Sequence, residues 1–148
     1  MMKTVTDVLE KIDFVNRCSA LSDRFSFRDD RLENYDNAKV KEIIKSFGYE
    51  TVRYYKRENF FKVEEISKPN SYDIVFNISF KYGLCEFIWN APWHQFLKLC
   101  NVDFANIKMP AFRSYDELHE ILTIAFEMYE DYKRELIALY EAYGTVKQ

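Results

Sequence analysis

Cys100, His94 and Asp103 are the residues of this chain whose types could support covalent chemistry. A cysteine thiolate is a nucleophile, a neighbouring histidine can take its proton, and a carboxylate can orient the histidine. However, neither the spacing of the three residues nor the residues beside them match a known nucleophile motif. We therefore expect His94 and Cys100 to have structural roles. A small enzyme that uses them is retained as the second alternative.

Other motifs for catalysis or ligand binding are absent from the sequence. There is no glycine-rich phosphate loop, no Gly-x-Ser-x-Gly and no His-Glu-x-x-His. The three glycines, Gly48, Gly83 and Gly144, each fall at an expected turn or helix end. His119 has no histidine or cysteine at the spacing of a metal site. We expect no catalytic residue, no cofactor and no metal, so the chain is predicted not to be an enzyme.

Length and composition indicate a single globular domain that covers residues 1–148. Hydrophobic residues make up 48% of the chain and charged residues 30%, which is a balance typical of a packed core. The net charge of −3 provides no general basic field, so nucleic acid is not an expected partner. We expect no secretory signal, no membrane-spanning segment and, with three widely spaced cysteines, a cytoplasmic location.

Helical periodicity predicts two helices in the N-terminal third of the chain. The first is expected from a cap at Thr4 to about Leu21. The second begins at Asp36 or Asn37, both good N-cap residues, and ends before Gly48, which suits a C-terminal position with positive φ.

A change of period from about 3.6 to 2 predicts four strands after the second helix. The first two strands are expected on either side of a two-residue turn at Glu58–Asn59, which places Tyr54 opposite Val63 and Arg53 opposite Glu64.

The third and fourth strands contain the most aromatic segment of the chain. A turn at Tyr82–Gly83 pairs Phe80 with Cys85 and Phe76 with Trp89. Every residue paired in this way lies on the apolar face, whereas Asn77 and Ser79 point to the other side. The segment is therefore predicted to be core, and Cys85 to be a small buried hydrophobe.

The outer face of the first hairpin has two readings. It alternates cations and rings, namely Arg53, Tyr55, Arg57, Phe60 and Lys62. Such a surface can stack single-stranded bases. Basic residues also protect an edge strand from pairing with another chain, and we prefer this reading because the protein is acidic.

A long helix is predicted at the C-terminal end. Ser114 and Glu117 form a capping box, and Gly144 follows the helix at about Tyr143. The fold class is therefore predicted to be α+β, with a four-stranded antiparallel meander packed against two N-terminal helices and one long C-terminal helix.

The long helix is expected to extend beyond the sheet. Its apolar residues repeat at spacings of three and four, and Tyr132, Leu136, Leu139 and Tyr143 lie past the strands. These side chains need cover because monomers seldom expose large apolar patches. Either the first two helices cover them, or a second copy does so in a homodimer that self-associates through this helix.

Two segments carry a resemblance to a known class of proteins. "SDRFSFRDDRLENYDN", Ser22 to Asn37, is an acidic and aromatic loop, and "NISFKYGLCEFIWNAPWHQF" is rich in rings. In these features the chain resembles the immunity proteins that bacteria make against polymorphic toxins and toxins of contact-dependent inhibition. The resemblance implies tight, non-catalytic binding to a cognate toxin domain, usually a nuclease.

The resemblance also assigns candidate partner-binding residues within the loop. Acidic side chains would face a basic toxin surface, with three aromatic rings as anchors. These residues are Asp23, Phe25, Phe27, Asp29, Asp30, Glu33, Tyr35 and Asp36. The alternative is a small acidic secretion chaperone or adaptor that acts as a dimer through the last helix.

Overall fold

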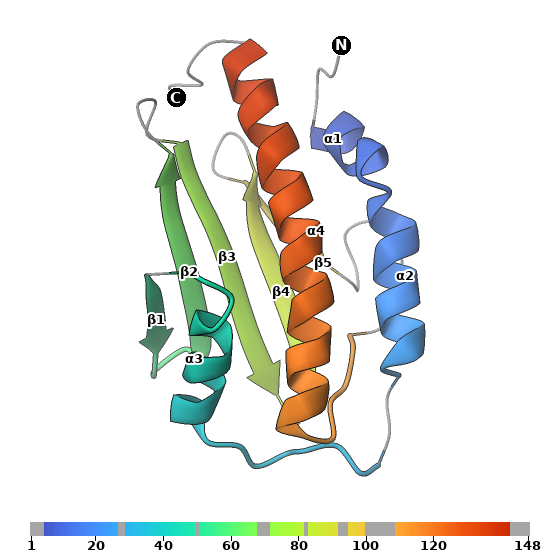
Figure 1. Cartoon of the computed structure of the whole chain (residues 1–148), viewed down its shortest axis with the longest axis vertical. Coiled ribbons are helices and arrows are strands. Elements are labelled where there is room, and N and C mark those ends of the chain that lie inside the picture. The colour runs from blue at the N-terminus through green and yellow to red at the C-terminus, as the bar shows by residue number, and fades with distance from the viewer. Residues whose placement is uncertain are drawn as a thin grey trace.

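A computed structural model describes residues 5–26, 29–49, 51–67, 72–81, 83–91, 95–99 and 109–142. Within them the order of elements is α1 (Val5–Lys11), α2 (Phe14–Arg24), α3 (Asn37–Lys45), β1 (Val52–Tyr55), β2 (Phe60–Ser67), β3 (Tyr72–Lys81), β4 (Leu84–Ala91), β5 (Gln95–Leu99) and α4 (Tyr115–Ala142). The strands form one antiparallel sheet in the order β1-β2-β3-β4-β5. The helices lie on the same face of the sheet, and α4 runs along its middle (Figure 1). The α+β class and the long C-terminal helix are as predicted.

The register of β3 and β4 is the predicted one. Phe76 pairs with Trp89 and Phe80 with Cys85. All four side chains are buried, as is Tyr129 of α4, whose ring lies 5.0 Å from that of Phe76. The aromatic segment is therefore core, because the pleat of two correctly paired strands places every second ring beneath α4.

The predicted register of the first hairpin is wrong by two residues. Tyr54 pairs with Phe61 instead of Val63, and Arg53 pairs with Lys62 instead of Glu64. The connection is a four-residue loop, in which Asn59 adopts a φ of 57° and donates its N–H to the oxygen of Tyr55 at 2.8 Å. Asparagine tolerates this left-handed conformation. A shift of two keeps every side chain on its predicted face.

The first predicted helix is divided into α1 and α2. Asp13 adopts φ 58° and ψ 45°, a left-handed conformation that a continuous helix cannot include. The break turns α2 relative to α1, so that Ile12 and Phe14 are both buried while Val15 is 44% exposed. The chain thus has three helices before the sheet, and the proposed cap at Thr4 lies outside the described residues.

A fifth strand was not predicted. Gln95–Leu99 pairs with β4, with Leu97 opposite Trp89 and Leu99 opposite Phe87. From the sequence, the segment after the fourth strand is interpreted as a hydrophobic connection that could contain a turn of helix. Five residues are too few for an alternating pattern to distinguish a strand from a helical turn.

The two predicted N-terminal caps that lie in the described residues are both present, one of them in altered form. Asp36 accepts the N–H of Ala38 at 2.9 Å, as an N-cap should. At α4 the hydroxyl of Ser114 accepts the N–H of Glu117 at 3.1 Å. The carboxylate of Glu117 returns to the N–H of Arg113, one residue earlier than in a capping box, at 2.9 Å.

Candidate protein-binding surfaces

The acidic loop between α2 and α3 is fixed to the body of the protein by its main chain. The N–H of Leu32 donates to the oxygen of Phe112 at 2.9 Å. The hydroxyl of Tyr35 donates to the oxygen of Phe80 at 2.6 Å, and burial raises the pKa of Tyr35 above its ordinary value. The N–H of Asp36 donates to the hydroxyl oxygen of Tyr115 at 2.9 Å. The segment from Leu32 to Asp36 is therefore held in place along the lower end of the sheet (Figure 1).

Gly83 brings this loop close to the start of β4. It has a φ of 77°, and a Cβ built on it would lie 2.8 Å from the Cβ of Arg31 and 3.0 Å from the oxygen of Leu32. A residue without a side chain is needed here both for the conformation and for the space.

The carboxylates of the loop point to solvent although its main chain is anchored. The exposed acidic residues are Asp29, Asp30, Glu33 and Asp36 in the loop, and Asp23, which the structure places in the last turn of α2. One oxygen of Asp36 accepts the N–H of Ala38. Two of them have distant basic partners, since Asp30 lies 3.7 Å from Arg113 and Glu33 lies 3.7 Å from Arg31. Exposed pairs of this length contribute little attraction. Within the described part of the chain, Asp23 and Asp29 have no ion pair.

The predicted aromatic anchors have other roles where the structure describes them. Phe25 is only 5% exposed, because the end of α2 directs its ring into the core, and its assignment as a surface anchor is wrong. Tyr35 is half-buried and uses its hydroxyl within the chain. Phe27 lies outside the described residues.

The first turns of α4 add acidic residues to this surface that the sequence analysis missed. Asp116 and Glu120 are exposed, and Glu120 lies 3.8 Å from Arg24 at the end of α2. No spacing rule connects them to the loop, since they follow it by some eighty residues. The contact between Tyr115 and Asp36 brings the two segments together.

The apolar residues at the far end of α4 are covered within the chain. Tyr132, Leu136 and Leu139 are at most 4% exposed and belong to the same core as Val8 and Ile12 of α1. The predicted cover by the N-terminal helices is therefore confirmed. The assignment of these three residues to self-association is wrong, and Tyr143 lies outside the described residues.

Ion pairs hold the N-terminal helices on α4. Arg17 of α2 lies 2.8 Å from Asp131, and Lys11 of α1 lies 2.9 Å from Glu135.

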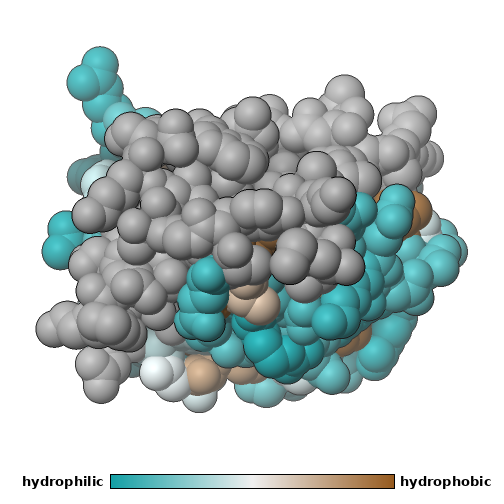
Figure 2. Space-filling model, turned by 90° about the horizontal axis from the view of Figure 1, so that it is seen from above, coloured by the Kyte–Doolittle hydropathy of each residue, from teal (hydrophilic) through white to brown (hydrophobic). Residues whose placement is uncertain are grey.

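Viewed from above, the described surface is mostly hydrophilic and its hydrophobic spots are small and separate (Figure 2). Val15 is the one exposed large hydrophobic residue among those whose side chains the structure describes.

The structure does not test the residues considered for catalysis. His94, Cys100 and Asp103 lie outside the described residues. Cys18 and Cys85 are both buried. The described residues contain no group of histidine, cysteine and acidic side chains that could hold a metal ion. None of the helices in the described ranges has the length and apolar character needed to cross a membrane.

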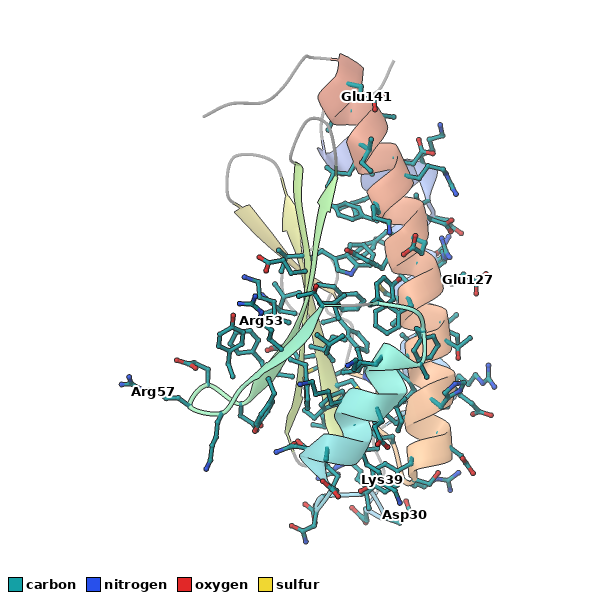
Figure 3. All side chains as sticks on the ribbon, turned by 60° about the vertical axis from the view of Figure 1, so that its left-hand side comes forward. Asp30, Lys39, Arg53, Arg57, Glu127 and Glu141 are labelled. Carbon is teal, nitrogen blue, oxygen red and sulfur yellow. The ribbon has the colours of Figure 1, made fainter. Side chains whose placement is uncertain are left out.

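The sheet face away from the helices forms a second polar surface. Arg53 and Arg57 extend from it, on the opposite side from α4, where Glu127 points outward (Figure 3). Tyr55 and Phe60 stack with ring centres 4.8 Å apart and an angle of 13° between the rings. Lys62 lies 3.4 Å from Glu64 on the same face. The interleaved cations and rings expected from the sequence are thus present together.

Comparisons with protein-family models, curated proteins and solved structures gave no match to this chain. The function proposed below is therefore inferred from the residues of this chain alone.

Proposed function

We propose that this chain is a non-catalytic protein-binding domain, and that it acts as an immunity protein that neutralises a cognate bacterial toxin domain. The toxin domain would present a basic surface, and a nuclease is the class that the resemblance implies. Binding would take place in the cytoplasm and would block the toxin's active site or its activation.

The observation that carries this proposal is the combination of a fixed main chain and exposed carboxylates in the acidic loop. Leu32, Tyr35 and Asp36 anchor the main chain through hydrogen bonds of 2.6–2.9 Å. The loop therefore loses little conformational entropy when a partner binds. Its carboxylates are available for charge-assisted hydrogen bonds to arginine and lysine.

The distribution of apolar residues favours a partner recognised by charge. Among the side chains that the structure describes, Val15 is the one large hydrophobic residue classed as exposed, and the others are buried or half-buried. A surface of this kind attracts a partner of opposite charge over long distances and accelerates association. Rapid association suits a protein that must intercept a toxin before it acts.

The alternative of a dimeric secretion chaperone required a free apolar seam on the last helix. Tyr132, Leu136 and Leu139 are buried, so these residues offer no free seam and the requirement is not met. The monomeric binding domain is therefore the better supported candidate.

The experiment is a test of protection in bacteria. The protein encoded directly upstream of this chain is expressed from an inducible promoter, alone or with this chain. We expect growth arrest by the upstream protein alone, growth with both, and a stable complex of the two purified proteins. An upstream protein that arrests growth equally in the presence of this chain, without forming a complex, would contradict the proposal.

A further inference from the structure

The open face of the sheet has a hollow of about 220 Å³ beside the first hairpin. It is lined by Glu58, Phe60, Asn77, Ser79, Glu86 and Ile88. The hollow is smaller than the roughly 300–1,000 Å³ of sites that enclose a drug-sized ligand. Its size therefore suits a single side chain.

The hollow follows from the lengths of side chains in neighbouring strands. Asn77 and Ser79 are short and lie on β3. Phe60 pairs with Ser79 from one side, and Ile88 pairs with Asn77 from the other. Tyr55 stacks on Phe60 and supports its ring from β1. Short residues on the middle strand thus form a floor between two longer walls.

The polar side chains that line the hollow are mainly hydrogen-bond acceptors. Glu58 and Glu86 carry the charges, and neither has an ion pair with a basic residue in the described ranges. The Ser79 hydroxyl donates to Glu86 at 3.2 Å. The side-chain oxygen of Asn77 is buried and finds no hydrogen-bond donor among the described residues.

We propose that this hollow binds the guanidinium group of an arginine presented by a partner protein. A guanidinium is planar, carries five N–H donors and packs well on an aromatic face. It would donate to Glu58 and Glu86 while it lies against Phe60. An ammonium group is more strongly hydrated and has three donors, so lysine matches the hollow less well.

Two cations near the hollow, Lys62 and Arg53, are placed elsewhere. Lys62 is the nearest neighbour in the pairing, opposite Asn77, but its Nζ lies 3.4 Å from a carboxylate oxygen of Glu64. Arg53 points away from the sheet (Figure 3). Neither of these two cations neutralises Glu58 or Glu86 in the lining.

This assignment rests on the proposed function only in that the arginine belongs to a protein partner. The hollow and the acidic loop lie on different parts of the molecule, so each can be tested without the other. The probe is the peptide acetyl-Gly-Arg-Gly-amide, titrated into the full ¹⁵N-labelled chain and followed by backbone amide shifts. The same peptide with citrulline in place of arginine is the control, because citrulline has nearly the same shape and no charge.

We expect saturable shifts at Phe60, Asn77, Ser79 and Glu86 with the arginine peptide, and at least about tenfold weaker binding of the citrulline peptide. Glu86→Gln keeps the size of the side chain and the acceptor for Ser79, and should weaken arginine binding at least about fivefold. Glu64→Gln lies on the same face outside the hollow and should leave binding within about twofold.

Three results would overturn the assignment. They are the absence of saturable shifts at the hollow, equal binding of the citrulline peptide, and shifts confined to the acidic loop. None of them would affect the proposed function, which the protection experiment tests separately. Conversely, arginine binding in the hollow together with failed protection would show a binding site without the immunity role.

Discussion

The hydroxyl of Tyr35 donates a 2.6 Å hydrogen bond to the main-chain oxygen of Phe80. The bond links the acidic loop to a residue of β3 that is 1% exposed. The ring of Tyr35 also packs edge-on against Phe80, with centres 5.9 Å apart. Since Asp36 follows directly and caps α3, the single contact fixes both the end of the loop and the start of the helix.

Replacing Tyr35 by phenylalanine should remove this bond and keep the ring. We expect the free energy of unfolding to fall by roughly 1–2 kcal/mol, because the buried oxygen of Phe80 loses its donor. Urea denaturation measures the change. Tyr55→Phe is the control, since Tyr55 stacks on the open face, and it should change stability by less than about 0.5 kcal/mol. Equal effects of the two substitutions would show that the Tyr35 hydroxyl does not anchor the loop.

The same tyrosine predicts a dependence of stability on alkaline pH. Burial raises the pKa of Tyr35, so the folded state binds this proton more tightly than the unfolded state. Its contribution is present below the unfolded pKa of about 10 and is lost as the pH rises through the folded pKa. The wild type should therefore lose stability above about pH 10 more steeply than Tyr35→Phe does. Denaturation curves over this range test it, and parallel curves for the two proteins would refute it.

Gly83→Ala should destabilise the protein more than Gly48→Ala. Both glycines have positive φ, 77° and 97°, so both substitutions introduce backbone strain of roughly 1 kcal/mol. A Cβ at Gly83 would also meet Arg31 at 2.8 Å, whereas the space at Gly48 is open. We expect an additional loss of roughly 1–3 kcal/mol at Gly83 from this overlap. Losses of equal size in thermal or urea denaturation would mean that the loop does not pack there.

Leu136→Ala should reveal that the end of α4 is core. The side chain is fully buried beside α1, so we expect a loss of about 2–5 kcal/mol in the free energy of unfolding. Ala138→Ser, at an exposed position of the same helix, should cost less than about 1 kcal/mol. Analytical ultracentrifugation should give the same mass for both variants and the wild type. A small loss at Leu136 with a reduced mass would instead indicate a seam between two chains.

The sequence predicted the pairing of β3 with β4 because a short turn and the apolar pattern gave the same register. The first hairpin lacked that agreement. Its longer loop depends on the left-handed conformation of Asn59, which many residues adopt only when tertiary contacts favour it. The break between α1 and α2 depends on the left-handed conformation of a single residue, Asp13. The helical pattern of apolar residues continues on both sides of it, so the pattern gives no sign of the break. Gln95–Leu99 offered too short a pattern to be recognised as a strand.

The sites were less predictable than the fold because they combine distant segments. The acidic loop was visible as a run of charges, but the contribution of Glu120 depends on how α4 meets α2. The hollow on the open face needs Glu58, Asn77 and Glu86 to meet across three strands. Asn77 was correctly expected to point outward. Glu58 was expected in a two-residue turn, so its position beside the open face was not predicted.

Charge reversal in the loop tests the central claim that the chain binds its partner through the acidic surface. The variant is Asp29→Lys with Asp30→Lys, and its partner is the toxin domain found in the protection experiment. Glu127→Lys with Glu141→Lys is the matched control, because it changes the net charge equally at exposed positions of α4 (Figure 3).

The measurement is the dissociation constant of each complex over a range of salt concentrations. We predict that the loop variant binds at least about tenfold more weakly than the wild type and depends less on salt, because it has lost attractive charges at the interface. The control should stay within about threefold of the wild type and keep its salt dependence. An unchanged affinity and salt slope for the loop variant, or an equal loss in the control, would contradict the claim.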